Sequence, residues 1–159
     1  RYLGTERKEV CTQVSLNHKM DEIQAAMLVH GFELIDDLVE VRVDMARRYS
    51  ERLTGVVGCP EVPKSGDRSS NFFDYVIFST ARDSLRQFLH SRGIETKIKH
   101  PVLLCDHPAY PCDPRPEIPV ADKLVSEMIS LPLHKNLDVT DIDFVCDAIY
   151  RFCHGQKNR

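Results

Sequence analysis

The sequence predicts a small mixed α/β domain of the α+β kind, preceded by one long helix. Two observations carry this prediction. Apolar residues recur every three or four positions from Asp21 to about Leu53, which is the spacing of an amphipathic helix. After it, strand-like and helix-like segments alternate, separated by Gly and Pro. The chain of 159 residues is 42% hydrophobic, which is enough for one core and too much for a disordered chain.

The long helix is the first predicted element. Asp21 can cap its start, and two nearby glycines are expected to end it after Leu53. Its apolar positions are Ile23, Met27, Leu34, Leu38, Val41 and Met45. At 1.5 Å per residue it is roughly 50 Å long, more than this small domain needs. We therefore expect a partner along its N-terminal half and poor burial of Met27, Leu34 and Ile35; a helix that only covers its own domain is the alternative.

The next segments predict two strands around a helix. Residues Phe72–Phe78 are aromatic and β-branched, as in a strand. Thr80, with Asp83 three residues later, is typical of a helix start, and Gly93 is typical of a helix end. Residues Ile94–Ile98 alternate between apolar and polar side chains, which predicts a half-buried strand.

A long loop and two helices complete the prediction. Six of the nine prolines lie between Pro101 and Pro119, so this stretch is a loop, and long loops are often functional. Pro119 favours the first turn of a helix that continues to about Met128. Leu131–Leu133 forms a short extended piece, and Thr140 is expected to cap a last amphipathic helix.

Composition excludes several classes of protein. The net charge of -3 and the scattered Lys and Arg argue against a surface for nucleic acid or an anionic membrane. No apolar run approaches the roughly 20 residues that span a bilayer, so we expect a soluble, cytoplasmic protein. We expect no metal site, because two Cys/His groups lack the tight spacing of zinc ligands. These groups are Cys105, His107 and Cys112, and Cys146, Cys153 and His154.

Local motifs for catalysis are missing from the sequence. There is no G-x-S-x-G and no Gly-rich phosphate loop. The paired acids Asp36–Asp37 and Asp141/Asp143 are explained as helix-surface and helix N-terminal residues. Composition, periodicity and spacing therefore leave the function open.

A resemblance to a known family narrows the possible functions. Residues 15–26 read S-L-N-H-K-M-D-E-I-Q-A-A, similar to a G-x-N-x-[RK]-M-x-x-[IL]-Q-A-A motif. Further similar segments follow in the expected order at residues 42–53, 93–96, 98–110, 120–124, 129–134 and 141–142. This pattern resembles the C-terminal part of the DegT/DnrJ/StrS family, the sugar aminotransferases that depend on pyridoxal 5'-phosphate (PLP).

The resemblance implies part of a type I aminotransferase fold whose large PLP domain is absent from this chain. Residues 1–20 then lead in from that domain, residues 21–55 form the connecting helix, and residues 56–159 form the small C-terminal α/β domain. No segment matches the family's S-x-H-x-x-K around the lysine that carries PLP. The chain is therefore expected to be inactive alone, with no catalytic residue of its own. One half of a split enzyme and a non-catalytic α/β interaction module are the alternatives.

The resemblance also assigns binding residues and partners. Asn17 and Lys19 match positions that reach the PLP phosphate of the neighbouring subunit, although Asn17 can also cap the helix and Lys19 can be solvated. The substrate-binding candidates are Lys99, His100, His107 and Tyr110. The implied enzyme is a homodimer, joined through the long helix and the large domain. It transfers an amino group from glutamate to a nucleotide-linked keto sugar, in amino-sugar or polysaccharide biosynthesis.

Overall fold

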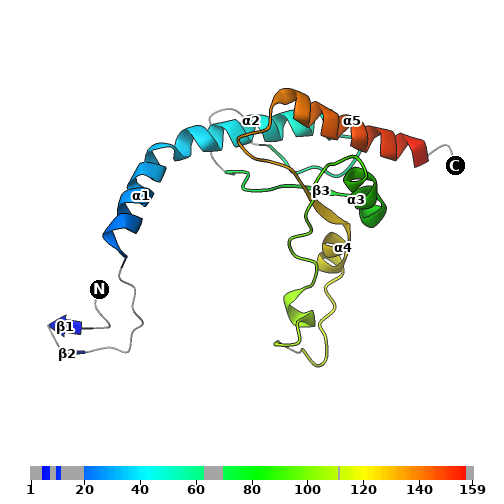
Figure 1. The fold of residues 1–159 in the computed structure, drawn as a ribbon. Coiled ribbons are helices and arrows are strands. Elements are labelled where there is room, and N and C mark those ends of the chain that lie inside the picture. Colours follow the sequence, from blue (N-terminus) through cyan, green and yellow to red (C-terminus); the bar gives the residue numbers. More distant parts are fainter. Residues whose placement is uncertain (1–4, 8–9, 12–19, 63–69, 111, 157–159) are drawn as a thin grey trace. The chain divides into compact units, whose positions relative to one another are not determined.

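The computed structural model describes residues 5–7, 10–11, 20–62, 70–110 and 112–156 (Figure 1). The chain divides into two compact units, residues 1–37 and residues 38–159. The first unit contains the antiparallel pair β1 (Thr5–Arg7) and β2 (Val10–Cys11), followed by α1 (Glu22–Glu33). α2 (Ile35–Leu53) begins in the first unit and continues in the second, which contains all later elements.

The long helix that the sequence predicts is interrupted once. α1 ends at Glu33 and α2 begins at Ile35, so the prediction of one unbroken helix is wrong at Leu34. The Leu34 N–H donates to the carbonyl of Gly31, three residues back, at 3.2 Å. This is the bond of a tighter 3₁₀ turn. Gly31 is a weak helix former, and this weakness favours a break nearby.

Apolar side chains around this break are exposed, as expected. Met27 is 71% exposed, and Leu34 and Ile35 are each 47% exposed. No residue of α1, which is described along its whole length, is buried. The prediction that these three side chains are poorly buried within this chain is confirmed.

The second unit is built on a two-stranded antiparallel sheet. β3 (Tyr75–Phe78) pairs with β4 (Met128–Leu131) along the whole length of both strands. Isolated bridges widen the sheet at both edges, from Gly58 beside β3 and from Lys97 beside β4. A side chain on Gly58 would approach the Cβ atom of Phe78 to 3.1 Å, so this close pairing favours glycine.

The predicted strand Ile94–Ile98 contributes only the Lys97 bridge, so its assignment as a full strand is wrong. Its first N–H, that of Ile94, donates instead to the carbonyl of Leu89. Leu89 belongs to α3 (Arg82–His90), and this bond helps to close the end of that helix. The start of the segment is therefore committed to the helix and cannot pair with the sheet.

Two helix ends follow their sequence signals. Gly93 comes after α3 with φ +76°, a conformation that glycine adopts easily and other residues rarely. α4 (Pro119–Glu127) begins with Pro119 in its first turn, as predicted. Between them lies the proline-rich loop, whose described part contains the short 3₁₀ helix η1 (Leu104–Asp106). Within the described part of the chain, no helix is long and apolar enough to cross a membrane.

Two predicted helix caps are wrong. α5 (Val139–Gln156) is capped by Asp138 rather than Thr140, because the Asp138 Oδ1 atom accepts the amide N–H three residues later at 2.9 Å. The Thr140 hydroxyl itself donates to the same Oδ1 atom at 2.6 Å. The carboxylate of Asp138 stands one residue ahead of α5, where a capping acceptor is needed. In α3 the residue at the capping position is Ala81, whose side chain makes no capping hydrogen bond, so the predicted cap at Thr80 is wrong.

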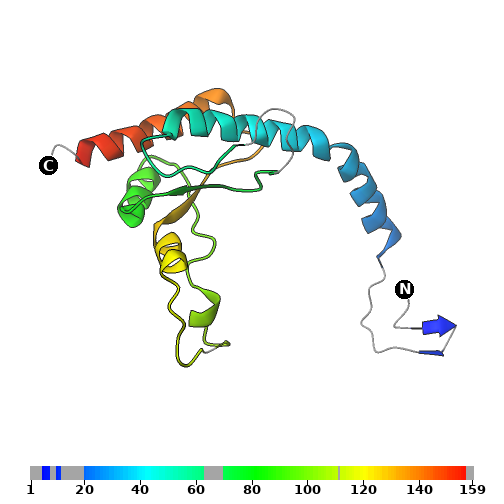
Figure 2. The same ribbon diagram turned by 180° about the vertical axis from the view of Figure 1, so that it is seen from behind.

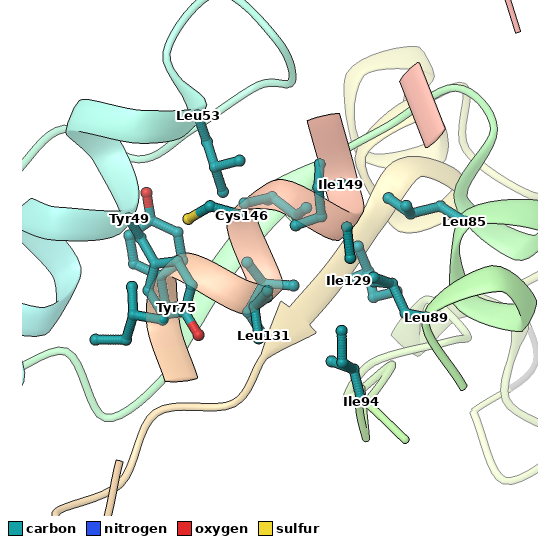
Figure 3. Close-up of a cluster of buried hydrophobic side chains, with 14 of the residues drawn as sticks. Tyr49, Leu53, Tyr75, Leu85, Leu89, Ile94, Ile129, Leu131, Cys146 and Ile149 are labelled. Carbon is teal, nitrogen blue, oxygen red and sulfur yellow. The ribbon is translucent and has the colours of Figure 1, made fainter. Parts of the chain in front are cut away.

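The core lies between the sheet and three helices (Figure 3). The largest fully buried side chains come from α2, α3, α5 and both strands: Tyr49, Leu53, Tyr75, Ile77, Leu85, Leu89, Ile129, Ile142, Cys146 and Ile149. Every side chain in this set is apolar, aromatic or a thiol, so burial in this core stabilises the second unit through the hydrophobic effect.

Charged side chains join α2 to α5 outside this core. Figures 1 and 2 show the two helices side by side from opposite directions. Arg48 on α2 holds the Asp143 carboxylate through two bonds of 2.9 and 2.6 Å. One turn along, Arg52 binds Asp147 at 2.5 Å and also lies 3.2 Å from Asp143. The guanidinium of Arg48 lowers the pKa of Asp143 below its ordinary value of 3.8.

Candidate functional site

A cavity of about 320 Å³ lies where β3 begins, β4 ends and the Lys97 edge adjoins them. Its described lining residues come from three segments that are far apart in sequence. They are Phe73, Asp74, Glu95, Lys97, Lys99, Ser130, Leu131, Pro132, Leu133 and His134. The pairing of β3 with β4 and the bridge from Lys97 bring these segments together.

Lys99 is the best-anchored basic residue of this cavity. Its Nζ atom lies 3.1 Å from the Asp74 Oδ2 atom and 4.3 Å from the centre of the Phe73 ring. The same Oδ2 atom accepts a hydrogen bond of 2.7 Å from the hydroxyl of Ser130, which is buried in β4. A carboxylate on one side and an aromatic face on the other therefore hold the ammonium group of a normally flexible side chain.

A strained turn positions the two residues that hold Lys99. Phe72 has φ +41°, in the left-handed region that a bulky side chain rarely adopts, and its ring is buried. The Phe73 N–H donates to the Asn71 Oδ1 atom at 3.0 Å, which fixes the turn locally. The Phe73 side chain is 70% exposed although it is large and apolar. Residues in sparsely populated backbone conformations, such as Phe72, cluster at functional sites.

The cavity lining at Pro132 is tied to the core by Tyr49. The Tyr49 hydroxyl donates to the carbonyl of Pro132 at 3.0 Å, and the Tyr49 ring stacks on Tyr75 with centres 4.9 Å apart. Figure 3 shows these two rings together in the core. Burial raises the pKa of Tyr49 well above its ordinary value of 10.0, so its hydroxyl remains a donor at any physiological pH.

Arg115 holds the proline-rich loop that contains two of the predicted site residues. Its guanidinium binds the Asp106 carboxylate at 2.5 and 3.0 Å and reaches Asp122 on α4 at 2.5 Å. This pairing lowers the pKa of Asp106 below its ordinary value of 3.8. Within the loop, the Tyr110 N–H donates to the His107 carbonyl at 2.9 Å. Arg115 therefore joins η1 to the first turns of α4.

The predicted substrate residues do not all meet in one place. Lys99 lines the cavity, whereas His100, His107 and Tyr110 are exposed and are not among its described lining residues. The two predicted phosphate-binding residues, Asn17 and Lys19, lie outside the residues that the structure describes.

Sequence reasoning missed three residues that shape these surroundings: Asp74, Phe73 and Arg115. An acidic residue inside an aromatic stretch is a signal that could have drawn attention to Asp74, although it does not show the contact with Lys99. An arginine among prolines, with aspartates nearby in the sequence, is the corresponding signal for Arg115.

The described residues do not fit the chemistry of a PLP-binding lysine. Four lysines are described, Lys97, Lys99, Lys123 and Lys135, and all are exposed. The Nζ atom of Lys99 is in addition paired with the Asp74 carboxylate at 3.1 Å. A lysine that carries PLP has to be free to form a bond to the cofactor, and an amino group bound by a carboxylate is not. No step of PLP chemistry is therefore assigned to the described part of the chain.

Comparison with known proteins decides the family. The model of the DegT/DnrJ/EryC1/StrS aminotransferase family matches residues 1–150. The chain belongs to this family. A solved structure of a DegT/DnrJ/EryC1/StrS aminotransferase from Brucella abortus has a TM-score of 0.84 and 33% identity, covering 95% of this chain and 40% of that one.

Two curated relatives carry informative names. UDP-2-acetamido-2-deoxy-3-oxo-D-glucuronate aminotransferase of Pseudomonas aeruginosa is 29% identical over 92% of this chain and 40% of its own length. UDP-N-acetyl-3-dehydro-alpha-D-glucosamine 3-aminotransferase of Acidithiobacillus ferrooxidans is 29% identical over 87% of this chain and 37% of its own length. The chain thus spans about 40% of the length of the family members that it matches.

Proposed function

We propose that this chain is the C-terminal part of a PLP-dependent aminotransferase that converts a nucleotide-linked keto sugar into an amino sugar. The family match over residues 1–150 carries this proposal. The similarity of fold to the aminotransferase from Brucella abortus, over 95% of this chain, supports it independently of any single motif. We further propose glutamate as amino donor, a homodimeric assembly and a cytoplasmic location.

In this enzyme, the cavity around Lys99 faces the sugar. The ammonium group is held in place before the substrate arrives, so little freedom is lost when it donates to a substrate oxygen. His100 follows directly in sequence, and the loop held by Arg115 presents His107 and Tyr110 to solvent. We propose that these exposed side chains border the route by which the nucleotide sugar reaches the site.

The cofactor belongs to the complete enzyme. When bound, PLP supplies the electron-withdrawing ring system on which amino groups are exchanged. We propose that Asn17 and Lys19 bind the phosphate of the PLP held by the other subunit, because an amide donor and an ammonium group suit a dianionic phosphate. Their place in the motif at residues 15–26, inside the matched range, supports this assignment.

We also propose the division into domains that the family resemblance implies. Residues 1–20 lead in from the large domain, residues 21–55 connect, and residues 56–159 form the small domain. The boundary between the two compact units, after Asp37, falls inside the proposed connecting segment.

Borohydride reduction tests the proposal, because it fixes PLP covalently to the lysine that carries it. In the full-length enzyme, peptide mass spectrometry should find the stoichiometric adduct on a lysine outside these 159 residues. The 159-residue chain alone should show only scattered surface labelling and no amino transfer. A single stoichiometric adduct on Lys19 or Lys99, with measurable turnover by this chain alone, would contradict the proposal.

A further inference from the structure

The cavity around Lys99 is electrically balanced. Besides His134, its described lining contains two lysines and two acidic residues, and each lysine has an acidic neighbour. Lys99 lies 3.1 Å from Asp74, and Lys97 lies 3.7 Å from Glu95. No arginine occurs among the described lining residues, although arginine is the side chain best suited to hold a carboxylate through two bonds.

The held ammonium group still has donor capacity. An ammonium group carries three N–H donors, and the described partners of Lys99 are one carboxylate oxygen and one ring face. Its side chain remains 33% exposed, on the surface that lines the cavity. Lys99 can therefore donate to an uncharged oxygen of a ligand, such as a hydroxyl or a carbonyl, without releasing Asp74.

A ligand carboxylate bound to Lys99 would lie close to the Asp74 carboxylate. A ligand oxygen bound to the Lys99 ammonium lies within about 6 Å of the Asp74 oxygen that shares this ammonium. Two negative groups at that separation repel each other strongly where water is partly excluded. Asp74 is itself fixed by Ser130, so it cannot easily turn away. This repulsion offsets about half of the attraction between a ligand carboxylate and Lys99. Because the carboxylate also loses hydration in the cavity, the geometry favours a neutral substrate group over a negative one.

We propose that Asp74 is a specificity-determining residue, which makes this site select a nucleotide-linked keto sugar with an uncharged substituent facing Lys99 and reject the corresponding uronate. This inference rests on the proposed function, in which Lys99 faces the sugar. It also indicates which of the substrates named for the two relatives this enzyme prefers. Their names describe the same type of sugar with and without a carboxylate, and both are 29% identical to this chain, so identity alone does not choose.

The test compares two substrates in the full-length enzyme. These are UDP-N-acetyl-3-dehydro-glucosamine and UDP-2-acetamido-2-deoxy-3-oxo-glucuronate, and kcat/KM is measured for each. The native enzyme should prefer the neutral sugar by about tenfold or more. Asp74→Asn should shift this ratio by about tenfold or more toward the uronate, because it removes the charge and keeps an acceptor for Ser130. Calorimetric Kd values for the two amino-sugar products should shift in the same direction.

Two further variants separate the effect of the charge at position 74 from the effect of side-chain shape and from the effect of losing a negative charge elsewhere on the protein. Asp74→Glu keeps the charge and should keep the preference for the neutral sugar. Asp44→Asn makes the same charge change at an exposed position of α2, outside the described cavity lining, and should leave the ratio within about twofold. Thermal unfolding of each variant shows whether the fold is intact.

The outcomes separate the two proposals. A native preference for the uronate, or an unchanged ratio in a folded Asp74→Asn variant, would overturn the role of Asp74. Amination of neither UDP sugar would overturn the substrate class inferred here. Transfer of nitrogen to other nucleotide-linked keto sugars would then decide whether the proposed function falls as well.

Discussion

Tyr49→Phe removes one hydroxyl between the core and the candidate site. That hydroxyl donates to the carbonyl of Pro132, which lines the cavity around Lys99. The ring stays, so its stacking on Tyr75 and its burial are unchanged. The substitution therefore isolates the hydrogen bond and leaves no cavity of any size behind.

The structure allows the magnitude to be worked out. An average hydrogen bond contributes about 1 kcal/mol net, and a buried acceptor left without its donor costs about 1–3 kcal/mol. Because the Tyr49 side chain is fully buried, we expect a loss of about 1.5 kcal/mol in the free energy of unfolding. For a chain of this length, that loss lowers the melting temperature by about 3–6 °C.

Urea and thermal unfolding, followed by circular dichroism, measure this loss. Tyr150→Phe is the matched control, since Tyr150 lies on α5 and is half exposed, and its free energy of unfolding should change by less than about 0.5 kcal/mol. An equal effect of the two substitutions, or an unchanged stability of Tyr49→Phe, would show that the bond to Pro132 does not stabilise the protein.

Four more predictions follow from charges and burial. Burial raises the pKa of the Cys146 thiol to about 12, so iodoacetamide at about pH 8.5 should alkylate the exposed Cys112 well before Cys146. Peptide mass spectrometry measures the labelling of each cysteine, and equal labelling of the two would contradict the burial of Cys146. The α2 arginines lower the pKa of Asp143, so its stabilising contribution is present above the ordinary value of 3.8 and is lost as pH falls through the lower folded value. Asp143→Asn should therefore flatten the acid side of the curve of unfolding free energy against pH, and an unchanged curve would refute this. Arg115→Gln should increase amide hydrogen exchange in the proline-rich loop several-fold while leaving exchange in β3 and β4 unchanged; equal exchange in the loop would show that the ion pairs do not order it. In the full-length enzyme, Asn17→Ala should weaken PLP retention about tenfold. A mixed dimer tests whether the contact crosses between subunits: one subunit carries Asn17→Ala and the PLP lysine, and its partner has an intact Asn17 but lacks that lysine. The first subunit should keep its PLP, and loss of PLP from it would place the contact within one subunit.

Much of the fold follows from local signals. Gly93 ends α3 and Pro119 begins α4 because these two residues have backbone preferences that do not depend on distant contacts. The predictions that are wrong depend on competition between neighbours. Thr140 loses the cap position to Asp138, and the Ile94 N–H is used by the end of α3 instead of the sheet.

The candidate site is less predictable for a physical reason. Lys99 was found through the family resemblance, but Asp74, which holds it, lies 25 positions away in the sequence, and Ser130, which fixes Asp74, lies 31 positions away. The pairing of β3 with β4 and the bridge from Lys97 to Ser130 bring these residues together. Local patterns carry no information on such contacts, so neither the electrical balance of the cavity nor the role of Asp74 was visible in the sequence.

Transfer of labelled nitrogen tests the central claim most directly. The full-length enzyme, PLP and [¹⁵N]glutamate are incubated with nucleotide-linked keto sugars, and the products are analysed by mass spectrometry. The proposed function predicts an amino-sugar nucleotide that carries the label, formed only when the part of the enzyme outside these 159 residues is present. Failure of the full-length enzyme to label any of the keto sugars would contradict it, and so would label transferred by this chain alone.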